Sequence, residues 1–147
     1  MAELTRVLQG TLEEGDALAA RLLKIRQTAV ALPGGAADLL PMVAKAEKSL
    51  DEILFVLRGH QARASFEEIP PAHLPVQNRV DELIGIQLST TSKPGRNQTD
   101  SYGIAREELA PLVEKLKALK TIDLPALEKE LDKRGAPWTP GRVLEIK

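Results

Sequence analysis

The sequence predicts an all-α fold: an up-and-down antiparallel bundle of four main helices, with a short C-terminal helix and an extended tail. Three observations predict it. Four segments repeat apolar residues in steps of three and four, which is the spacing of one face of an α-helix. No segment alternates apolar and polar residues as a half-buried strand does. The length of 147 residues suits one domain, residues 1–147, and a bundle is the simplest way to bury four apolar stripes against one another.

The first predicted helix carries an apolar seam in alternating steps of four and three. Gly10 and Gly15 each weaken a helix by roughly 1 kcal/mol relative to alanine. We therefore expect either a late start near Thr11 or a close approach of another helix. Pro33-Gly34-Gly35 ends the segment, because proline cannot continue the helical hydrogen bonds. The seam consists of Leu4, Leu8, Thr11, Gly15, Leu18, Leu22, Ile25, Ala29 and Leu32.

The second predicted helix begins near Asp38, with Pro41 in its first turn, where the missing N–H costs nothing. We expect it to stop at Gly59 or to continue to about Ala64. Residues 65–75 contain three prolines and have no period, so they are predicted to connect two helices across an end of the bundle. The stripe of this helix consists of Val43, Ala46, Leu50, Ile53, Leu54 and Leu57.

The third predicted helix follows Pro75, and a polar loop over residues 89–100 separates it from the fourth. Pro94-Gly95 is the expected turn in that loop. The inner side of the third helix is expected to consist of Val76, Val80, Leu83, Ile84, Gln87 and Leu88.

The fourth predicted helix begins near residue 100 or 101 and runs to about Lys120, with Pro111 expected to kink it or to lie near a late start. Asp123 is the expected N-cap of a short fifth helix, which ends near Arg134 before Gly135. The stripe of the fourth helix consists of Ala105, Leu109, Leu112, Leu116 and Leu119, with Val113 beside it.

The composition excludes several classes of function. Twenty Lys and Arg against twenty-one Asp and Glu give a net charge of −1, so the chain lacks the basic footprint of a nucleic-acid-binding protein. Cysteine is absent, which removes disulfides, thiolate metal sites and a cysteine nucleophile. The longest apolar run, residues 53–57, is far shorter than the roughly 20 residues of a membrane span.

Candidate catalytic and metal-binding residues each have a simpler explanation. His60 and His73 flank the proline-rich connection, with Glu67 and Glu68 as possible oxygen ligands, but the helical spacing of metal-binding bundles is missing. We expect two surface histidines, no resident cofactor and no metal. None of the serines lies in a Gly-x-Ser-x-Gly elbow. The adjacent glutamates, 13–14, 67–68 and 107–108, are expected to face solvent, because neighbouring helical residues point in different directions.

Two short polar motifs lie close together in the loop before the fourth helix. Lys93-Pro94-Gly95-Arg96 lacks the Gly-Lys-Ser/Thr ending of a phosphate-binding loop, so a solvated turn is expected. Asn97-Gln98-Thr99 matches the N-glycosylation pattern, which carries information only in a eukaryotic secretory setting.

The tail, residues 136–147, contains the only tryptophan of the chain, Trp138, between Pro137 and Pro140. Two prolines restrict the backbone, so this segment loses little entropy when it docks. Pro137, Trp138, Pro140 and Arg142 are therefore a candidate anchor for another domain or chain. The alternative is that Trp138 packs over the end of its own bundle.

From about Arg79 onward the sequence carries motifs in a recognisable order. They are Asp81-Glu82-Leu83, the polar loop through Thr99, Tyr102-Gly103-Ile104-Ala105, Glu108-Leu109-Ala110-Pro111, Asp123-Leu124-Pro125-Ala126-Leu127-Glu128 and Gly135-Ala136-Pro137-Trp138-Thr139-Pro140-Gly141-Arg142. This order resembles the C-terminal helical region of large bacterial proteins with sortilin-type β-propellers, built of BNR (Asp-box) repeats and often labelled glycosyl hydrolases. The Pro-Trp-Thr-Pro-Gly-Arg ending is the most specific element.

The resemblance implies that the chain is one domain of a longer, exported protein whose propeller lies upstream. Any hydrolase activity would then belong to the propeller, and no catalytic residue of such a propeller maps onto this sequence. We expect a non-catalytic module that packs against the propeller or holds partner chains, including copies of itself.

Two alternatives stay open. The first is a freestanding bundle that binds a small ligand or a metal, for which Thr11, Gly15 and Gln87 are the polar or small seam positions. The second is a self-associating helical adaptor.

Overall fold

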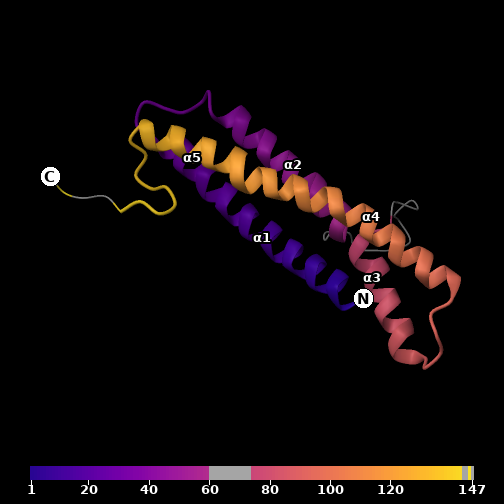
Figure 1. The fold of residues 1–147 in the computed structure, drawn as a ribbon. Helices are drawn as coiled ribbons and strands as arrows, with labels where there is room; N and C mark the ends of the chain where they lie inside the picture. Colours follow the sequence, from indigo (N-terminus) through magenta and orange to yellow (C-terminus); the bar gives the residue numbers. More distant parts are fainter. Residues whose placement is uncertain (60–73, 144–145, 147) are drawn as a thin grey trace, which may run out of the picture. The chain divides into compact units, whose positions relative to one another are not determined.

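The computed structural model describes residues 1–59, 74–143 and 146. Within this part of the chain the protein is all-α, with four helices packed in contact and no strand, which confirms the predicted fold class. Figure 1 shows the elements in chain order, and a π-helical turn, η2, joins the last two helices into one continuous helical segment. The elements are α1 (Ala2–Ala31), α2 (Leu40–Arg58), α3 (Val76–Ser89), α4 (Arg96–Ala118), η2 (Leu119–Asp123) and α5 (Leu124–Lys133).

The contacts within the chain define two compact units. Unit 1 consists of residues 1–13 and 52–115, and unit 2 consists of residues 14–51 and 116–147. Unit 1 therefore holds the start of α1, the end of α2, all of α3 and most of α4. Unit 2 holds the rest of α1 and α2 together with η2, α5 and the tail.

The core of unit 2 comes from the predicted stripes of α1 and α2 and from the leucines of α5. Arg26 on α1 pairs with Glu47 on α2 at 2.5 Å across the turn between the two helices, as expected for an antiparallel pair. Glu14 pairs with Lys120, and Arg21 with Glu128, so α5 runs in the same direction as α1. The buried apolar side chains include Leu18, Leu22, Ile25, Ala29, Val43, Ala46, Leu50, Leu124, Leu127 and Leu131.

The core of unit 1 gathers four helical segments. Its buried side chains are Leu4 and Leu8 from α1; Ile53, Leu54 and Leu57 from α2; Val76, Val80 and Leu83 from α3; and Ala105, Leu109 and Leu112 from α4. The apolar spacing in the sequence therefore identified the buried face of α1, α2 and α4, because side chains three and four residues apart share one face of a helix.

The prediction for the inner side of α3 was wrong at its C-terminal end. Leu88 is 83% exposed, and Gln87 is also exposed. The apolar spacing continues past Leu83, but Leu83 is the last buried residue of α3. Spacing shows which face of a helix is apolar and does not show where the neighbouring helices end.

Two predicted helix starts also differ from the structure. α1 begins at Ala2, so Gly10 lies inside the helix and the late start near Thr11 was wrong. α4 begins at Arg96, before the predicted start, and the Gln98 side chain accepts a hydrogen bond from the Gly95 N–H at 2.6 Å. That bond satisfies one of the free N–H groups at the start of a helix.

Asp123 is not an N-cap. Its backbone is helical, with φ −71° and ψ −50°, and its side chain makes no capping hydrogen bond. The helical segment instead continues through η2, where the N–H of Leu124 donates to the carbonyl of Leu119 five residues earlier. This widened turn ends two residues before Pro125, and a π turn is one of the ways in which a helix accommodates a local disruption.

Candidate functional site

The C-terminal tail begins with a sharp end to α5. Gly135 has a φ of +75°, which glycine adopts without the steric cost that other residues meet. The N–H of Ala136 donates to the carbonyl of Leu131, and the N–H of Gly135 donates to the carbonyl of Asp132, each at 3.0 Å. This is the Schellman pattern of helix termination. It fixes the direction in which the tail leaves unit 2.

Asp132, in the last turn of α5, holds the tail against the helix. Its carboxylate accepts a hydrogen bond from the hydroxyl of Thr139, which is only 2% exposed. The same carboxylate pairs with Arg142 at 3.0 Å. Arg142 also donates to the carbonyl of Ala136. Residues 136–142 are therefore folded into a compact hook, which we call the tail hook.

The tail hook presents Trp138 at the surface of unit 2. Trp138 is 41% exposed, and the ammonium group of Lys24 on α1 lies 5.9 Å from the centroid of its ring. That distance is within the range of a cation–π contact. Pro137 and Pro140 are exposed beside it. Of the four candidate anchor residues, Arg142 thus shapes the hook, while Trp138 and the two prolines lie on its outer surface.

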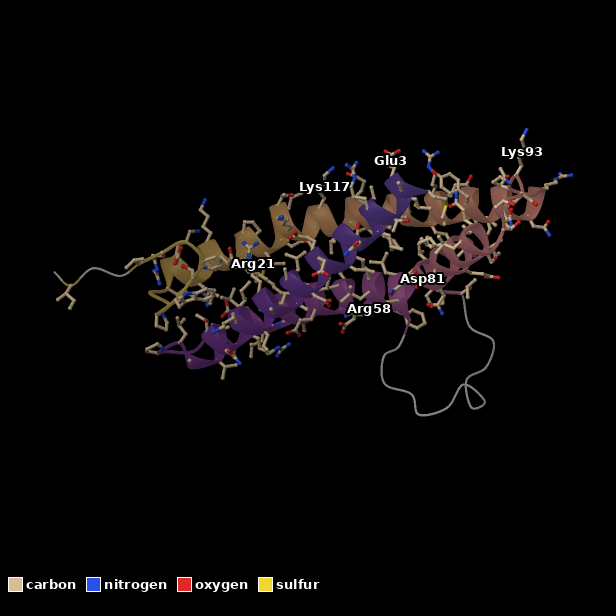
Figure 2. All side chains as sticks on the ribbon, turned by 90° about the horizontal axis from the view of Figure 1, so that it is seen from below. Glu3, Arg21, Arg58, Asp81, Lys93 and Lys117 are labelled. Atoms are coloured by element: carbon tan, nitrogen blue, oxygen red, sulfur yellow. The ribbon has the colours of Figure 1, made fainter. Side chains whose placement is uncertain are left out.

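The same unit contains a partly buried ion pair beneath its surface. Arg21 on α1 meets Glu128 on α5 through two hydrogen bonds of 2.5 and 2.6 Å, and the Glu128 side chain is 12% exposed. The hydrogen bonds to Glu128 raise the pKa of Arg21 above its ordinary value, although burial acts in the opposite direction. Figure 2 shows Arg21 at the α1 ribbon. Each carboxylate oxygen of Glu128 accepts a hydrogen bond from Arg21, so the pair links α1 to α5.

The predicted polar and small positions of the seam have different surroundings. The Thr11 hydroxyl donates to the Val7 carbonyl one turn earlier, at 2.7 Å, so this hydroxyl is satisfied within α1. Gly15 is buried, and it belongs to the other unit. Gln87 lines a surface pocket of about 470 Å³ in unit 1, together with Leu83 and Tyr102. Of these three positions, Gln87 therefore lies at the surface and not in a core.

The remaining candidates are placed as follows. His60, His73, Glu67 and Glu68 lie outside the described residues. Across residues 1–59, 74–143 and 146, no three His, Cys, Asp or Glu side chains are grouped so that they could hold a metal ion. Lys93 is exposed and points away from the ribbon in Figure 2, and Asn97 is exposed in the first turn of α4.

The adjacent glutamates are not equivalent. Glu107 is exposed, whereas the side chain of Glu108 is 24% exposed and lies 3.8 Å from the guanidinium of Arg79. Glu14 pairs with Lys120. The prediction that all of these carboxylates face solvent was therefore wrong for Glu108. In the described part of the chain, no helix is both long enough and apolar enough to cross a membrane.

Sequence reasoning missed Asp132 as the residue that organises the tail. A negative charge in the last turn of a helix is unfavourable next to the negative end of the helix dipole. An aspartate at this position, three residues before Gly135, is therefore a signal that its carboxylate has a partner elsewhere. The sequence alone does not identify Thr139 and Arg142 as those partners, because the backbone of the tail must first turn back.

Comparison with known proteins gives no match: neither a protein-family model, nor a curated protein sequence, nor a solved structure matches this chain.

Proposed function

We propose that this chain is a non-catalytic helical module that binds another domain or protein through its tail hook. The observation that carries the proposal is the exposure of Trp138 on a segment that is itself held in place. A tryptophan on a flexible tail would pay an entropy cost on docking, and a pre-formed hook reduces that cost. Tryptophan is also among the residues that contribute most to protein–protein binding.

We further propose that the partner surface is a sortilin-type β-propeller that precedes this module in the same polypeptide. The support for this step is the resemblance carried by residues 79–142, above all Pro137-Trp138-Thr139-Pro140-Gly141-Arg142. In this proposal the parent protein is exported, and any glycosyl hydrolase activity belongs to the propeller. The module contributes packing, with no catalytic residue of its own.

The first experiment tests the propeller directly. The residues encoded upstream of Met1 are read from the gene, expressed as a separate domain and titrated with this chain while the fluorescence of Trp138 is followed. We expect Asp-box repeats in the upstream sequence, and a shift of Trp138 emission to shorter wavelength as the ring becomes buried. An upstream sequence without such repeats, or a propeller that leaves the emission unchanged, would overturn the proposal.

Three variants test the hook. Trp138→Ala should weaken binding of the upstream domain at least tenfold. Val30→Ala is the control, because Val30 is 68% exposed on α1 of the same unit, and it should bind like the wild type. Asp132→Ala removes the carboxylate that holds Thr139 and Arg142, so trypsin should cleave after Arg142 faster than in the wild type. Equal binding by the Trp138 and Val30 variants would contradict the role of the hook.

A further inference from the structure

A groove of about 680 Å³ lies in unit 1 between the first turns of α1 and the middle and later turns of α4. On α4 it extends from Tyr102 to Glu114, which at 1.5 Å per residue is about 18 Å, or three helical turns. On α1 it is bordered by Glu3, Leu4 and Val7, and Figure 2 labels Glu3 at the start of this helix. We call it the α1–α4 groove.

The floor of the groove is apolar. Leu4 and Leu109, which are 5% and 3% exposed, belong to the core of unit 1 and form its deepest part. Val7, which is 38% exposed, and Val113 add apolar surface nearer the opening. The apolar surface that still contacts water, that of Val7 and Val113, is stabilised when a second apolar surface covers it.

The rim of the groove is acidic. Three carboxylates, those of Glu3, Glu107 and Glu114, line it together with one guanidinium, that of Arg106. All four side chains belong to exposed residues. The rim thus carries more negative than positive charge, which favours a partner with positive charge and disfavours one with negative charge.

Small residues keep the groove open. A Cβ atom added at Gly103 would have no described atom within 4 Å beyond its own helical surroundings, so the packing of unit 1 does not require glycine there. Glycine inside a helix lowers its stability relative to alanine. Ala110, two turns further along α4, is small and exposed. These two positions allow a second backbone to come close to α4.

We propose that the α1–α4 groove binds a positively charged amphipathic helix of a partner protein. A groove between two helices, with an apolar floor and a charged rim, fits the apolar face of a third helix. Its length matches about three turns of such a helix, and the carboxylates of Glu3 and Glu107 would pair with Lys or Arg flanking the apolar face. This inference concerns unit 1 and does not depend on Trp138, which lies in unit 2.

The first test uses two synthetic peptides of 18 residues. One is built of Leu, Ala and Lys, with Leu at helical spacing and Lys on both flanks, and the other has Glu in place of every Lys. Each carries fluorescein, and its binding to the full chain is measured by fluorescence anisotropy. We expect the Lys peptide to bind at least tenfold more tightly than the Glu peptide, and to lose affinity as NaCl rises from 50 to 500 mM. Equal affinities for the two peptides would overturn the proposal.

The second test places the peptide in the groove. Gly103→Leu puts a side chain into the open space and should weaken binding of the Lys peptide at least tenfold. Gly85→Leu is the matched control, since Gly85 lies on α3, does not line the groove and also has no described atom within 4 Å of an added Cβ. Gly103→Ala should raise the unfolding temperature while it weakens binding, so a loss of affinity cannot be assigned to misfolding. Wild-type binding by Gly103→Leu would overturn the proposal.

The third test distinguishes the proposed binding from two alternatives: a second copy of this chain in the groove, and binding of the peptide at the tail hook. If sedimentation shows a dimer of the wild type that Gly103→Leu abolishes, a second copy of this chain fills the groove and the proposed partner helix is wrong. Trp138→Ala should leave binding of the Lys peptide unchanged. If it abolishes that binding instead, the peptide binds at the tail hook, and the inference about the groove fails while the proposed function stands.

Discussion

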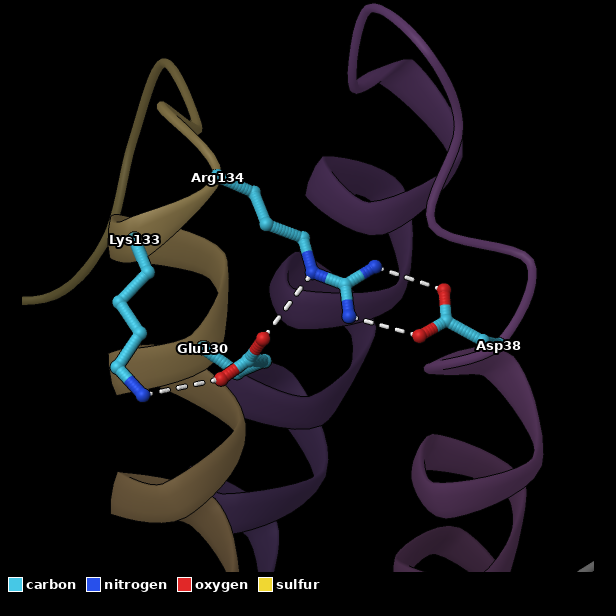
Figure 3. A network of polar contacts seen from close by, with 4 residues as sticks. All are labelled: Asp38, Glu130, Lys133 and Arg134. Carbon is cyan, nitrogen blue, oxygen red and sulfur yellow. Dashed lines mark hydrogen bonds and ion pairs between the residues drawn. The ribbon is translucent and has the colours of Figure 1, made fainter.

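Arg134, at the end of α5, holds the carboxylate of Asp38 in the turn between α1 and α2 through two parallel hydrogen bonds of 2.7 Å each. Arg134 also contacts Glu130 at 3.3 Å, and Lys133 reaches the same glutamate at 3.4 Å. Figure 3 shows the four side chains as one network at this end of unit 2. The paired geometry matches the planar guanidinium to the planar carboxylate, so the network connects two segments that are 96 residues apart.

The network predicts a loss of stability in acid. The hydrogen bonds from Arg134 hold the pKa of Asp38 below its ordinary value, and those from Arg134 and Lys133 do the same for Glu130. A carboxyl group with a lowered pKa stabilises the folded state fully above its unfolded pKa of about 4, and this contribution is lost as the pH falls through the folded pKa. Asp38→Asn should therefore lower the unfolding temperature at pH 7, and the difference from the wild type should shrink as the pH falls below the unfolded pKa and through the lower folded pKa.

Circular dichroism melts at a series of pH values measure this effect. Asp81→Asn is the control for the loss of one negative charge, because Asp81 is an exposed aspartate of α3 in the other unit. It should change the unfolding temperature less than Asp38→Asn does at pH 7. A difference between Asp38→Asn and the wild type that persists undiminished at pH 2 would show that the ion pair is not its cause.

The ion pair of Arg21 and Glu128 is less exposed than that of Arg134 and Asp38, because the carboxylate of Glu128 is largely shielded from water. Removing Arg21 leaves Glu128, 12% exposed, without its two hydrogen-bond donors. We expect Arg21→Met to cost about 2 kcal/mol, less than the 3–5 kcal/mol typical of a fully buried pair, because Arg21 itself is 27% exposed.

The double variant Arg21→Met, Glu128→Leu is the informative comparison. Replacing both charges with apolar side chains of similar size is often nearly neutral, since no charge is left buried alone. Urea unfolding of the wild type, both single variants and the double variant gives the coupling energy between the two residues. A double variant that is as unstable as the sum of its single variants would contradict a direct interaction.

The sequence predicted the features that depend on residues close together in the chain, and it missed those that depend on residues far apart. The stripes of α1, α2 and α4 were predicted because helical spacing alone determines which residues share a face. The exposure of Leu88 and the continuous passage through Asp123 were not predicted, because they depend on where neighbouring helices end and on how η2 accommodates Pro125. Local signals at Asp123 and Pro125 are those of a helix start, but the backbone stays helical through both positions.

The candidate sites were also predicted only where the signal lies within one segment of the chain. The composition of the tail singled out Trp138, Pro137, Pro140 and Arg142, but the role of Asp132 depends on a reversal of the backbone after Gly135. The α1–α4 groove could not be predicted at all. It exists because Val7 and Val113, which are distant in sequence, line the same hollow. No periodicity within either helix contains that information.

Two neighbouring leucines of α1 offer a direct check of the core. Leu22 is 1% exposed and Leu23 is 55% exposed, so the same substitution at each position separates burial from helix propensity. We expect Leu22→Ala to cost about 3 kcal/mol, through lost burial and the cavity left behind. Leu23→Ala should change the free energy of unfolding by less than about 0.5 kcal/mol. Urea titration measures both, and similar values at the two positions would contradict the packing of α1 in unit 2.

Two helix-ending glycines allow backbone strain to be separated from a steric contact. Gly59 and Gly135 both have a φ of +75°, so alanine at either position meets the cost of the left-handed region, about 1 kcal/mol. At Gly135 an added Cβ would have no described atom within 4 Å, whereas at Gly59 it would lie 3.1 Å from Cγ of Pro75. Gly59→Ala should therefore be the more destabilising of the two, because the proline ring must also move.

The difference between these two variants measures the contact with Pro75 alone, since the φ angle is the same in both. Gly85→Ala, inside α3, is the opposite control and should stabilise the protein by up to about 1 kcal/mol, because it replaces a helical glycine in open space. Denaturant unfolding with linear extrapolation gives all three values. If Gly59→Ala and Gly135→Ala are equally destabilising, the ring of Pro75 moves without cost, and strain at φ accounts for both helix ends.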